Sequence, residues 1–240
     1  LYVFSCGIAA KQMADKVNAR IVSNGVKGEV HTYSVTDYAE SVINAASGVY
    51  SDKAVNAVKA MLNYGTAAQQ YFGYNTDNPA NSIMTDDDKN MDMVGFNTYT
   101  GKLVNADSVS GISYYGSSLV LESDTILRNY FELSDGYSID NYTFYVKDKD
   151  GNKNIIAPQK TDASLYYIDI SNVKAYELAD NVNIYVQKNG DSEDKIMMLE
   201  YGAYVYARYV DKYLDNTALK NLMTAMYHYC NAATEYANIY

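Results

Sequence analysis

The side chains that offer a specific chemistry in this sequence are tyrosines. The chain has 240 residues, of which 27 are tyrosine, 5 are phenylalanine and none is tryptophan. A tyrosine ring can stack on the C–H-rich face of a sugar while its hydroxyl group remains hydrated. Tyr114 and Tyr115 are adjacent in the polar, glycine-containing run SYYGSS at residues 113–118. We therefore interpret this run as the best candidate for a sugar-binding loop.

Other residues in polar segments extend this candidate site. Tyr99 and Tyr137 each stand in a short loop-like run of polar residues and glycine. Asn97, Asn129 and Asp135 are candidates for hydrogen bonds to sugar hydroxyl groups. The alternative for each tyrosine is a loop residue that lies on the protein's own surface. If residues 113–118 form a strand, at most one tyrosine of the pair is buried, because neighbouring side chains point to opposite faces.

Residue types that support catalysis are sparse in this sequence. The two histidines, His31 and His228, lack a second metal ligand at a suitable spacing, and a surface histidine is the simpler interpretation of each. The sequence has no nucleophile elbow, phosphate-binding loop or dinucleotide fingerprint. A carboxylate pair could still be assembled in space, and the acidic residues that we consider for it are Glu122, Glu132, Asp135 and Asp140. We expect a protein that is not an enzyme and needs no cofactor and no metal.

Two acidic clusters have structural explanations. Thr85 followed by three aspartates is typical of a capped helix start, where carboxylates are stabilised by the helix dipole. Residues 148–154, DKDGNKN, resemble the start of a calcium loop, but the twelfth position is Gln159 where such loops carry glutamate. A tight turn between two strands explains this second cluster better.

Composition excludes several classes of partner. A net charge of -10 disfavours nucleic acids and anionic membrane surfaces, and no apolar run is long enough to span a bilayer. Cys6 and Cys230 are interpreted as small buried hydrophobic residues, although a disulfide between them stays open. The sequence opens on a strand-like run without a signal peptide, so we expect a piece of a longer protein.

The elements that would position these residues follow from hydrophobic periodicity and turn signals. Asn24-Gly25 and Asn189-Gly190 are each expected at the tip of a hairpin. The expected helices are residues 36–44, 51–72, 201–213 and 217–240, with Ser51 as an N-cap and Gly73 as a helix end. The expected strands are residues 1–10, 16–22, 29–35, 118–122, 126–133, 142–147, 165–170, 181–187 and 195–199.

A sequence repeat relates the two long helices. Residues 54–74 and 219–239 match at seven of twenty-one positions when one segment is shifted by 165, and most matches follow one helical face. At the same shift, the residues from Ala14 to Gly25 share six identities with residues 179–190. We predict from the shared helical face that Met61, Ala68, Met226 and Ala233 are buried.

The repeat predicts an α+β fold with two related lobes. Each lobe is expected to be an antiparallel β-sheet or sandwich followed by a helix pair. The predicted boundaries are residues 1–81 for a first lobe that lacks its N-terminal strands, 82–111 for a connector and 112–240 for the second lobe.

Four segments resemble a known module: residues 33–43 (YSVTDYAESVI), 58–81, 7–21 (GIAAKQMADKVNARI) and 118–133 (SLVLESDTILRNYFEL). The module is repeated in secreted, dockerin-bearing or leucine-rich surface proteins of gut clostridia, and this chain is most similar to the starch-adherence proteins of amylosomes. The resemblance implies an extracellular or cell-surface setting, a β-sandwich with helices, and non-catalytic binding of starch or another α-1,4-glucan. It also implies attachment to other modules of a larger protein or complex. The alternative function is a structural or adhesion spacer that binds no small ligand.

Overall fold

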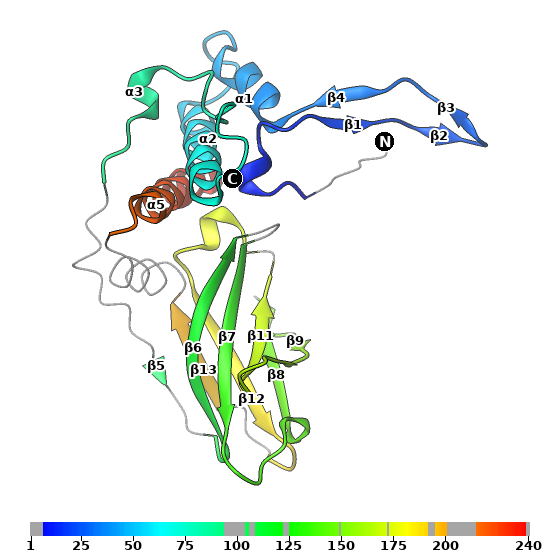
Figure 1. Ribbon diagram of the computed structural model, residues 1–240, viewed down its shortest axis with the longest axis vertical. Helices are drawn as coiled ribbons and strands as arrows, with labels where there is room; N and C mark the ends of the chain where they lie inside the picture. Colours follow the sequence, from blue (N-terminus) through cyan, green and yellow to red (C-terminus); the bar gives the residue numbers. More distant parts are fainter. Residues whose placement is uncertain are drawn as a thin grey trace. The chain divides into compact units, whose positions relative to one another are not determined.

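The computed structural model describes residues 7–93, 104–105, 109–121, 125–148, 150–171, 173–191, 195–200 and 215–238. The chain forms two compact units, residues 1–94 together with 213–240, and residues 95–212 (Figure 1). All described α-helices belong to the first unit, and the two larger sheets belong to the second. The fold is therefore mixed α+β with antiparallel sheets.

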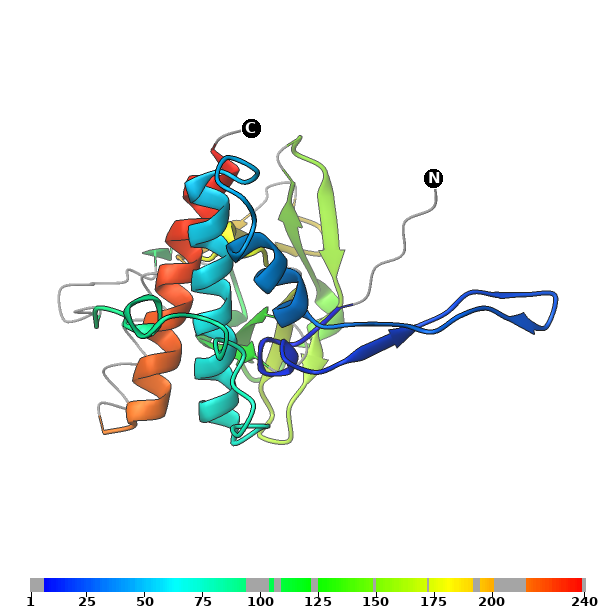
Figure 2. The same ribbon diagram turned by 90° about the horizontal axis from the view of Figure 1, so that it is seen from above.

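Two 21-residue helices form the centre of the first unit. Helix α2, Asp52–Phe72, and helix α5, Thr217–Ala237, lie side by side in all views (Figures 1 and 2). Ser51 caps α2 by accepting a hydrogen bond from the Ala54 amide, and Gly73 ends it in the left-handed conformation, as the sequence predicted. The rings of Tyr64 and Tyr229 stack between the helices with centroids 5.8 Å apart.

The shared helical face is buried only in part. Ala68 is 2% exposed and Met226 is also buried, which confirms the prediction for these two residues. Met61 and Ala233 are each partly exposed, so the prediction of full burial was wrong for them. Ala233 lies toward the C-terminal end of α5, whereas Met61 lies near the middle of α2, directly before the buried stretch that begins at Leu62.

Short helices flank this pair. Helix α1, Val35–Ile43, packs against α2 and begins with a capping box formed by Ser34 and Asp37. Helix α3, Asp86–Lys89, is capped by Thr85, which confirms that the acidic cluster is a helix start. The 3₁₀ helix η1, Ala10–Gln12, packs against α2.

A narrow two-stranded arm, residues 17–33, extends from the helices of the first unit (Figures 1 and 2). Asn24 and Gly25 both have positive φ at its tip, which confirms the predicted hairpin turn. The pair at the base of the arm is β1, Val17–Ala19, with β4, His31–Tyr33, and the pair near the tip is β2, Val22–Ser23, with β3, Val26–Lys27.

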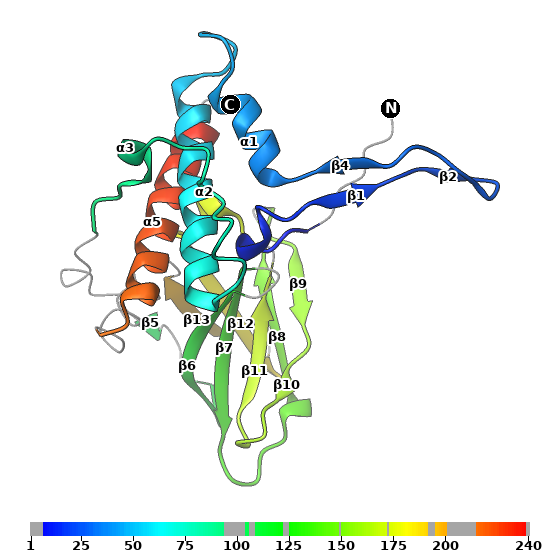
Figure 3. The same ribbon diagram turned by 45° about the horizontal axis from the view of Figure 1, so that its top comes forward.

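The second unit contains two antiparallel sheets (Figure 3). The first sheet has the order β10-β11-β7-β6, with β10 Gln159–Lys160, β11 Tyr166–Ile170, β7 Thr125–Leu133 and β6 Ile112–Leu121. The second sheet has the order β5-β13-β12-β8-β9, with β5 Val104–Asn105, β13 Lys195–Glu200, β12 Asn181–Lys188, β8 Tyr142–Lys147 and β9 Lys153–Ile156. The 3₁₀ helices η3, Ile139–Asn141, and η4, Ala175–Glu177, lie in the connections.

One hydrophobic core joins the two sheets. Alternate residues of β6, β7 and β11 from the first sheet meet alternate residues of β8 and β12 from the second. The fully buried members include Leu127, Phe131, Phe144, Ile168 and Val186. The outward positions of the same strands are consequently left for other contacts.

The units differ from the lobes that the sequence predicted. Helix α5 follows the sheets in sequence but packs on α2 in the first unit, instead of closing a second lobe at residues 112–240. Residues 82–93 likewise belong to the first unit and do not form a separate connector. The strand expected at residues 1–6 and the helix expected at 201–213 lie outside the described residues.

Candidate functional site

The two adjacent tyrosines lie on strand β6 and point to different sides. A bulge interrupts the pairing of β6 with β7 between Tyr114 and Gly116, and Tyr115 is the inserted residue. The ring of Tyr114 meets Phe131 edge-on, with centroids 5.9 Å apart, beside the core. Tyr115 is 64% exposed. The expectation of a loop was wrong, but the expectation that one tyrosine at most is buried is confirmed.

Tyr137 lies in the turn after β7 and packs on the protein itself. Its hydroxyl is 3.2 Å from that of Ser110, and the Lys188 ammonium is 5.0 Å from its ring centroid. A Cβ atom at Gly111 would come within 2.2 Å of the Tyr137 ring. This arrangement matches the alternative that we set out for each tyrosine, a loop residue on the protein's own surface.

The polar candidates are not brought together. Asn129 is fully buried and its Nδ2 donates to the Leu127 carbonyl at 3.2 Å, so the prediction that it contacts a ligand at the surface was wrong. Its side chain fell on the inward face because β7 alternates strictly. Asp135 is exposed in the turn before Tyr137. Asn97 and Tyr99 lie outside the described residues.

A cross-strand row with two tyrosines at its centre crosses the outward face of the first sheet. Gly116 on β6, Tyr130 on β7, Tyr167 on β11 and Gln159 on β10 are successive cross-strand partners. The rings of Tyr130 and Tyr167 are 6.0 Å apart between centroids. We call Tyr115, Tyr130 and Tyr167 the tyrosine platform, since the bulge places Tyr115 next to Gly116 at the end of this row.

Polar groups hold the platform in place. The Tyr167 hydroxyl donates to Gln159 Oε1 at 2.7 Å, and the Tyr130 hydroxyl is 3.2 Å from that of Ser118. Because these two hydroxyl groups are anchored, the Tyr130 and Tyr167 rings are fixed before any ligand arrives.

An ion pair borders the platform on the next cross-strand row. Arg128 Nε and Nη2 donate to the two carboxylate oxygens of Asp169, each at 2.8 Å. The guanidinium group also lies 4.1 Å from the Tyr167 ring centroid, a cation–π distance. Hydrogen bonding to Asp169 raises the pKa of Arg128 above its usual value, so the guanidinium stays charged. Arg128 and Asp169 thus place fixed polar groups beside the aromatic rings. Their opposite charges neutralise each other.

Four residues of the platform and its border were not predicted from the sequence: Tyr130, Tyr167, Arg128 and Asp169. A signal existed in the alternation of β7 and β11, where polar or tyrosine side chains occupy every second position. It could not show that residues near 116, 130, 159 and 167 share one row, because that depends on strand order and register.

The other chemically suggestive residues have structural roles. The Asn152 side chain donates to Asp148 Oδ2, and the backbone amides of Asn152 and Asp150 donate to Asp148 Oδ1. These hydrogen bonds, the one from the Asn152 side chain first, lower the pKa of Asp148. The Asp148 carboxylate thus closes the turn between β8 and β9, and the predicted turn between two strands at this cluster is confirmed. The Nε2 atom of His228 is 2.8 Å from the Asp92 carbonyl oxygen, and Cys230 is buried.

The arrangement suits recognition by shape and stacking. Across the described ranges, no group of three or more histidine, cysteine, aspartate or glutamate side chains could hold a metal ion. No helix in the described part of the chain has the length and apolar composition needed to cross a membrane. The platform offers flat apolar rings bordered by hydrogen-bonding groups, which fits a ligand with apolar faces and hydroxyl groups.

No family model, curated protein or solved structure matches this chain, so the candidate site rests on the geometry given above.

Proposed function

We propose that this protein is a non-catalytic, extracellular carbohydrate-binding protein whose ligand is starch or a related α-1,4-glucan. The observation that carries the proposal is the tyrosine platform on the outward face of the β10-β11-β7-β6 sheet. Tyr115 offers its exposed ring for stacking, and Tyr130 extends the aromatic surface along the same row.

Charge favours a neutral glycan over an anionic one. The chain has a net charge of -10, and Arg128, the cation that lies over the Tyr167 ring, is already paired with Asp169. An anionic polysaccharide would be repelled by the net charge and would have to compete for that guanidinium group. A neutral glucan needs only ring stacking and hydrogen bonds to hydroxyl groups.

The fold that we propose for this function is a β-sandwich within an internally duplicated chain. The shared core of the two sheets supports the sandwich. The ordered sequence matches from residues 14–25 to 179–190 and from 54–74 to 219–239 support the duplication. In both copies the Asn-Gly pair follows a strand, β2 in the first and β12 in the second.

A structural or adhesion role in a larger assembly is the second candidate function. The exposed apolar side chains of the arm, Ile21, Val22 and Val26, favour it, because such a surface is typical of contacts with other protein modules. Both functions can belong to one protein, since the arm and the platform lie in different units.

Affinity electrophoresis in soluble starch, followed by calorimetry with maltoheptaose, tests the binding proposal. We expect weak binding that strengthens with glucan length, and no release of reducing sugar. Tyr115→Ala should weaken binding about tenfold or more, which corresponds to about 1.4 kcal/mol.

Tyr38→Ala is the matched control, because Tyr38 is also highly exposed but lies on α1 in the other unit. This variant should bind like the unaltered protein. If the unaltered protein binds no glucan, the binding proposal fails and the spacer function remains. If Tyr115→Ala retains full affinity, the platform is not the site.

A further inference from the structure

The arm exposes an apolar surface of a kind that is usually covered by other parts of a protein. Ile21 is 74% exposed and Val26 is 72% exposed, and Tyr33 at the base of the arm is also exposed. Within the described residues, β1 pairs only with β4, and β2 pairs only with β3. A two-stranded hairpin without further strands is marginal in water, and its open edges invite another strand.

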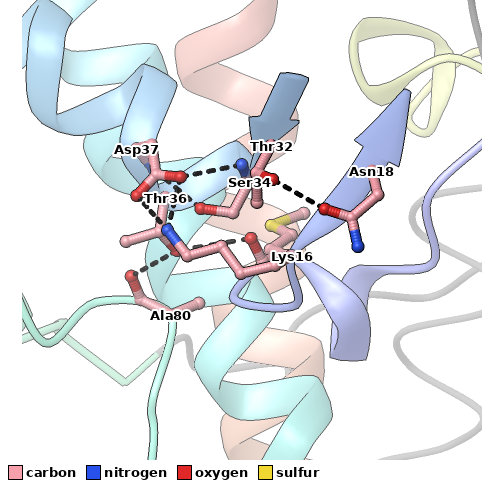
Figure 4. Close-up of polar contacts among 8 residues, drawn as sticks. Lys16, Asn18, Thr32, Ser34, Thr36, Asp37 and Ala80 are labelled. Atoms are coloured by element: carbon pink, nitrogen blue, oxygen red, sulfur yellow. Dashed lines mark hydrogen bonds and ion pairs between the residues drawn. The ribbon is translucent and has the colours of Figure 1, made fainter. Parts of the chain in front are cut away.

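The base of the arm is nevertheless held firmly on the helices of its own unit. Lys16 Nζ lies 2.6 Å from both carboxylate oxygens of Asp37 on α1, and Asp37 also accepts from the Ser34 amide (Figure 4). The Thr36 hydroxyl lies 3.3 Å from the Met13 carbonyl oxygen. These contacts fix the direction in which the arm leaves α1, so its apolar surface is presented in a defined orientation.

A cross-strand contact continues this order into the arm. The Thr32 hydroxyl donates to Asn18 Oδ1 at 2.7 Å (Figure 4). By the pairing register, this pair lies on the opposite face of the hairpin from Val17 and Tyr33. The arm therefore has one face with a polar cross-strand pair and another with apolar side chains, as in a sheet that packs on a core.

A related hairpin in the same chain shows what covers such a face. At the shift of 165, Val17, Ala19 and Ile21 correspond to Val182, Ile184 and Val186 on β12. Ile184 and Val186 are buried in the core of the second unit, and Val182 packs against that core. In the same sheet, β12 pairs with β8 along its other edge, and β13 pairs with β5. Within the part of the chain that the structure describes, the arm has the hairpin without these neighbours.

We propose that the arm is a docking element for a β-module of the same type as residues 95–170. In the complex, a strand equivalent to β8 would pair with the free edge of β1. A sheet equivalent to β10-β11-β7-β6 would cover Val17, Ala19 and Ile21. The inference rests on the duplication and is independent of glucan binding.

A second copy of this chain does not fit the same position. In each copy the place between β8 and β5 is already occupied by β12 and β13 of its own second unit. The arm of one molecule would have to displace that hairpin to enter. The partner is therefore a β-module without a central hairpin of its own.

The experiment supplies such a module to the full chain. An extended protein carries an additional copy of residues 95–170, the module named in the proposal, joined before Leu1 by a flexible linker. Hydrogen exchange measured by mass spectrometry compares the amides of residues 17–22 in the extended and unextended proteins. We expect at least tenfold slower exchange in the extended protein, because these amides become part of a larger, covered sheet.

Two variants of the extended protein form a matched pair. Ile21→Gln places an amide where the related hairpin has the buried Val186, and it should abolish the added protection. Val22→Gln introduces the residue that stands at the corresponding position 187, and it should leave the protection unchanged. Each variant removes one exposed aliphatic side chain, and the two positions are neighbours in the sequence. A general loss of apolar surface therefore cannot explain a difference in protection between the two variants.

Three results would overturn the inference. The first is fast exchange of residues 17–22 in an extended protein whose added segment is protected. The second is fast hydrogen exchange throughout the added segment. This result would show that the added module does not fold together with the arm, although the arm is proposed to supply its central hairpin. The third is a concentration-dependent dimer of the unextended protein with a protected arm, which would identify a second copy as the occupant. Starch binding is measured in a separate experiment. The hydrogen-exchange results therefore test the docking of the arm even if the protein binds no starch.

Discussion

At the residue scale, one bulge gives two adjacent tyrosines different tasks. Tyr114 packs against Phe131 at the core, whereas Tyr115 is directed into solvent at the end of the tyrosine platform. A change of both residues to alanine, which the loop interpretation would treat as harmless to the fold, therefore mixes a core defect with a surface change. The single substitutions separate the two effects.

We expect Tyr114→Ala to destabilise the second unit by about 3 kcal/mol, because it removes an aromatic ring from the edge of the core. Tyr115→Ala should change the stability by less than about 0.5 kcal/mol, the range of ordinary surface substitutions. Urea unfolding followed by near-ultraviolet circular dichroism measures both. Equal costs for the two substitutions would contradict the assignment of inward and outward faces.

Gly111 is a position where the backbone and a neighbouring ring both require glycine. It has φ +83°, and an added Cβ would lie 2.2 Å from a Tyr137 ring atom. We expect Gly111→Ala to cost about 1–2 kcal/mol for the backbone and a further 1–3 kcal/mol for displacing the ring. Gly136→Ala is the control, since Gly136 has φ +82° with open space around it and should cost only the backbone part. Indistinguishable melting temperatures would show that Tyr137 moves away freely.

At the element scale, the helices follow local signals and the sheets follow long-range pairing. Helix α2 begins after Ser51 and ends at Gly73 because a capping hydroxyl and a left-handed glycine satisfy its terminal groups. The platform needs strands β6, β7, β10 and β11 in one order and register. One register shift in β7 would exchange Tyr130 and Asn129 between the two faces of the sheet.

The same substitution should have different costs at two matching positions of the repeated helical face, because the two positions differ in burial. Ala68 is buried on α2, so Ala68→Leu should overpack the surrounding core and lower the free energy of unfolding by about 1–3 kcal/mol. Ala233 occupies the matching position of α5 but is partly exposed, so Ala233→Leu should cost less than about 1 kcal/mol. Thermal unfolding of both variants measures the difference. A larger cost for Ala233→Leu would reverse the burial assignment.

At the scale of the whole molecule, the first unit is built from both ends of the chain. Helix α5 supplies Leu222, Met223 and Met226 to the buried interior of this unit, although about 120 residues of the second unit separate it from α2. The second unit has its own core with contributions from both of its sheets. The two units should therefore respond differently to removal of the chain ends.

We expect residues 95–212 to fold when produced alone, because every member of the shared core lies within them. Residues 1–94 alone should stay largely unfolded, because α2 would expose the face that α5 covers. Circular dichroism and hydrogen exchange of the two fragments test this. Adding a peptide of residues 213–240 should restore helical signal and protection to residues 1–94. A stably folded fragment 1–94 would contradict the division.

The sequence alone determined the features that depend on neighbouring residues. These are α2 with its capping residues, the turn at Asn24-Gly25, the helix start at Thr85, the turn at Asp148 and most strands of the second unit. Each depends on backbone conformation or on hydrogen bonds within a few residues, so the local pattern contains the necessary information.

Only the tertiary structure decided which residues meet across the chain. Tyr130 and Tyr167 are partners because β7 and β11 pair in one register, and Asn129 is buried because it lies one position away on the inward face. The assignment of α5 to α2, rather than to the sheets before it, likewise depends on contacts between distant segments. Many registers and pairings satisfy the same hydrophobic pattern, and the packing of complete cores selects among them.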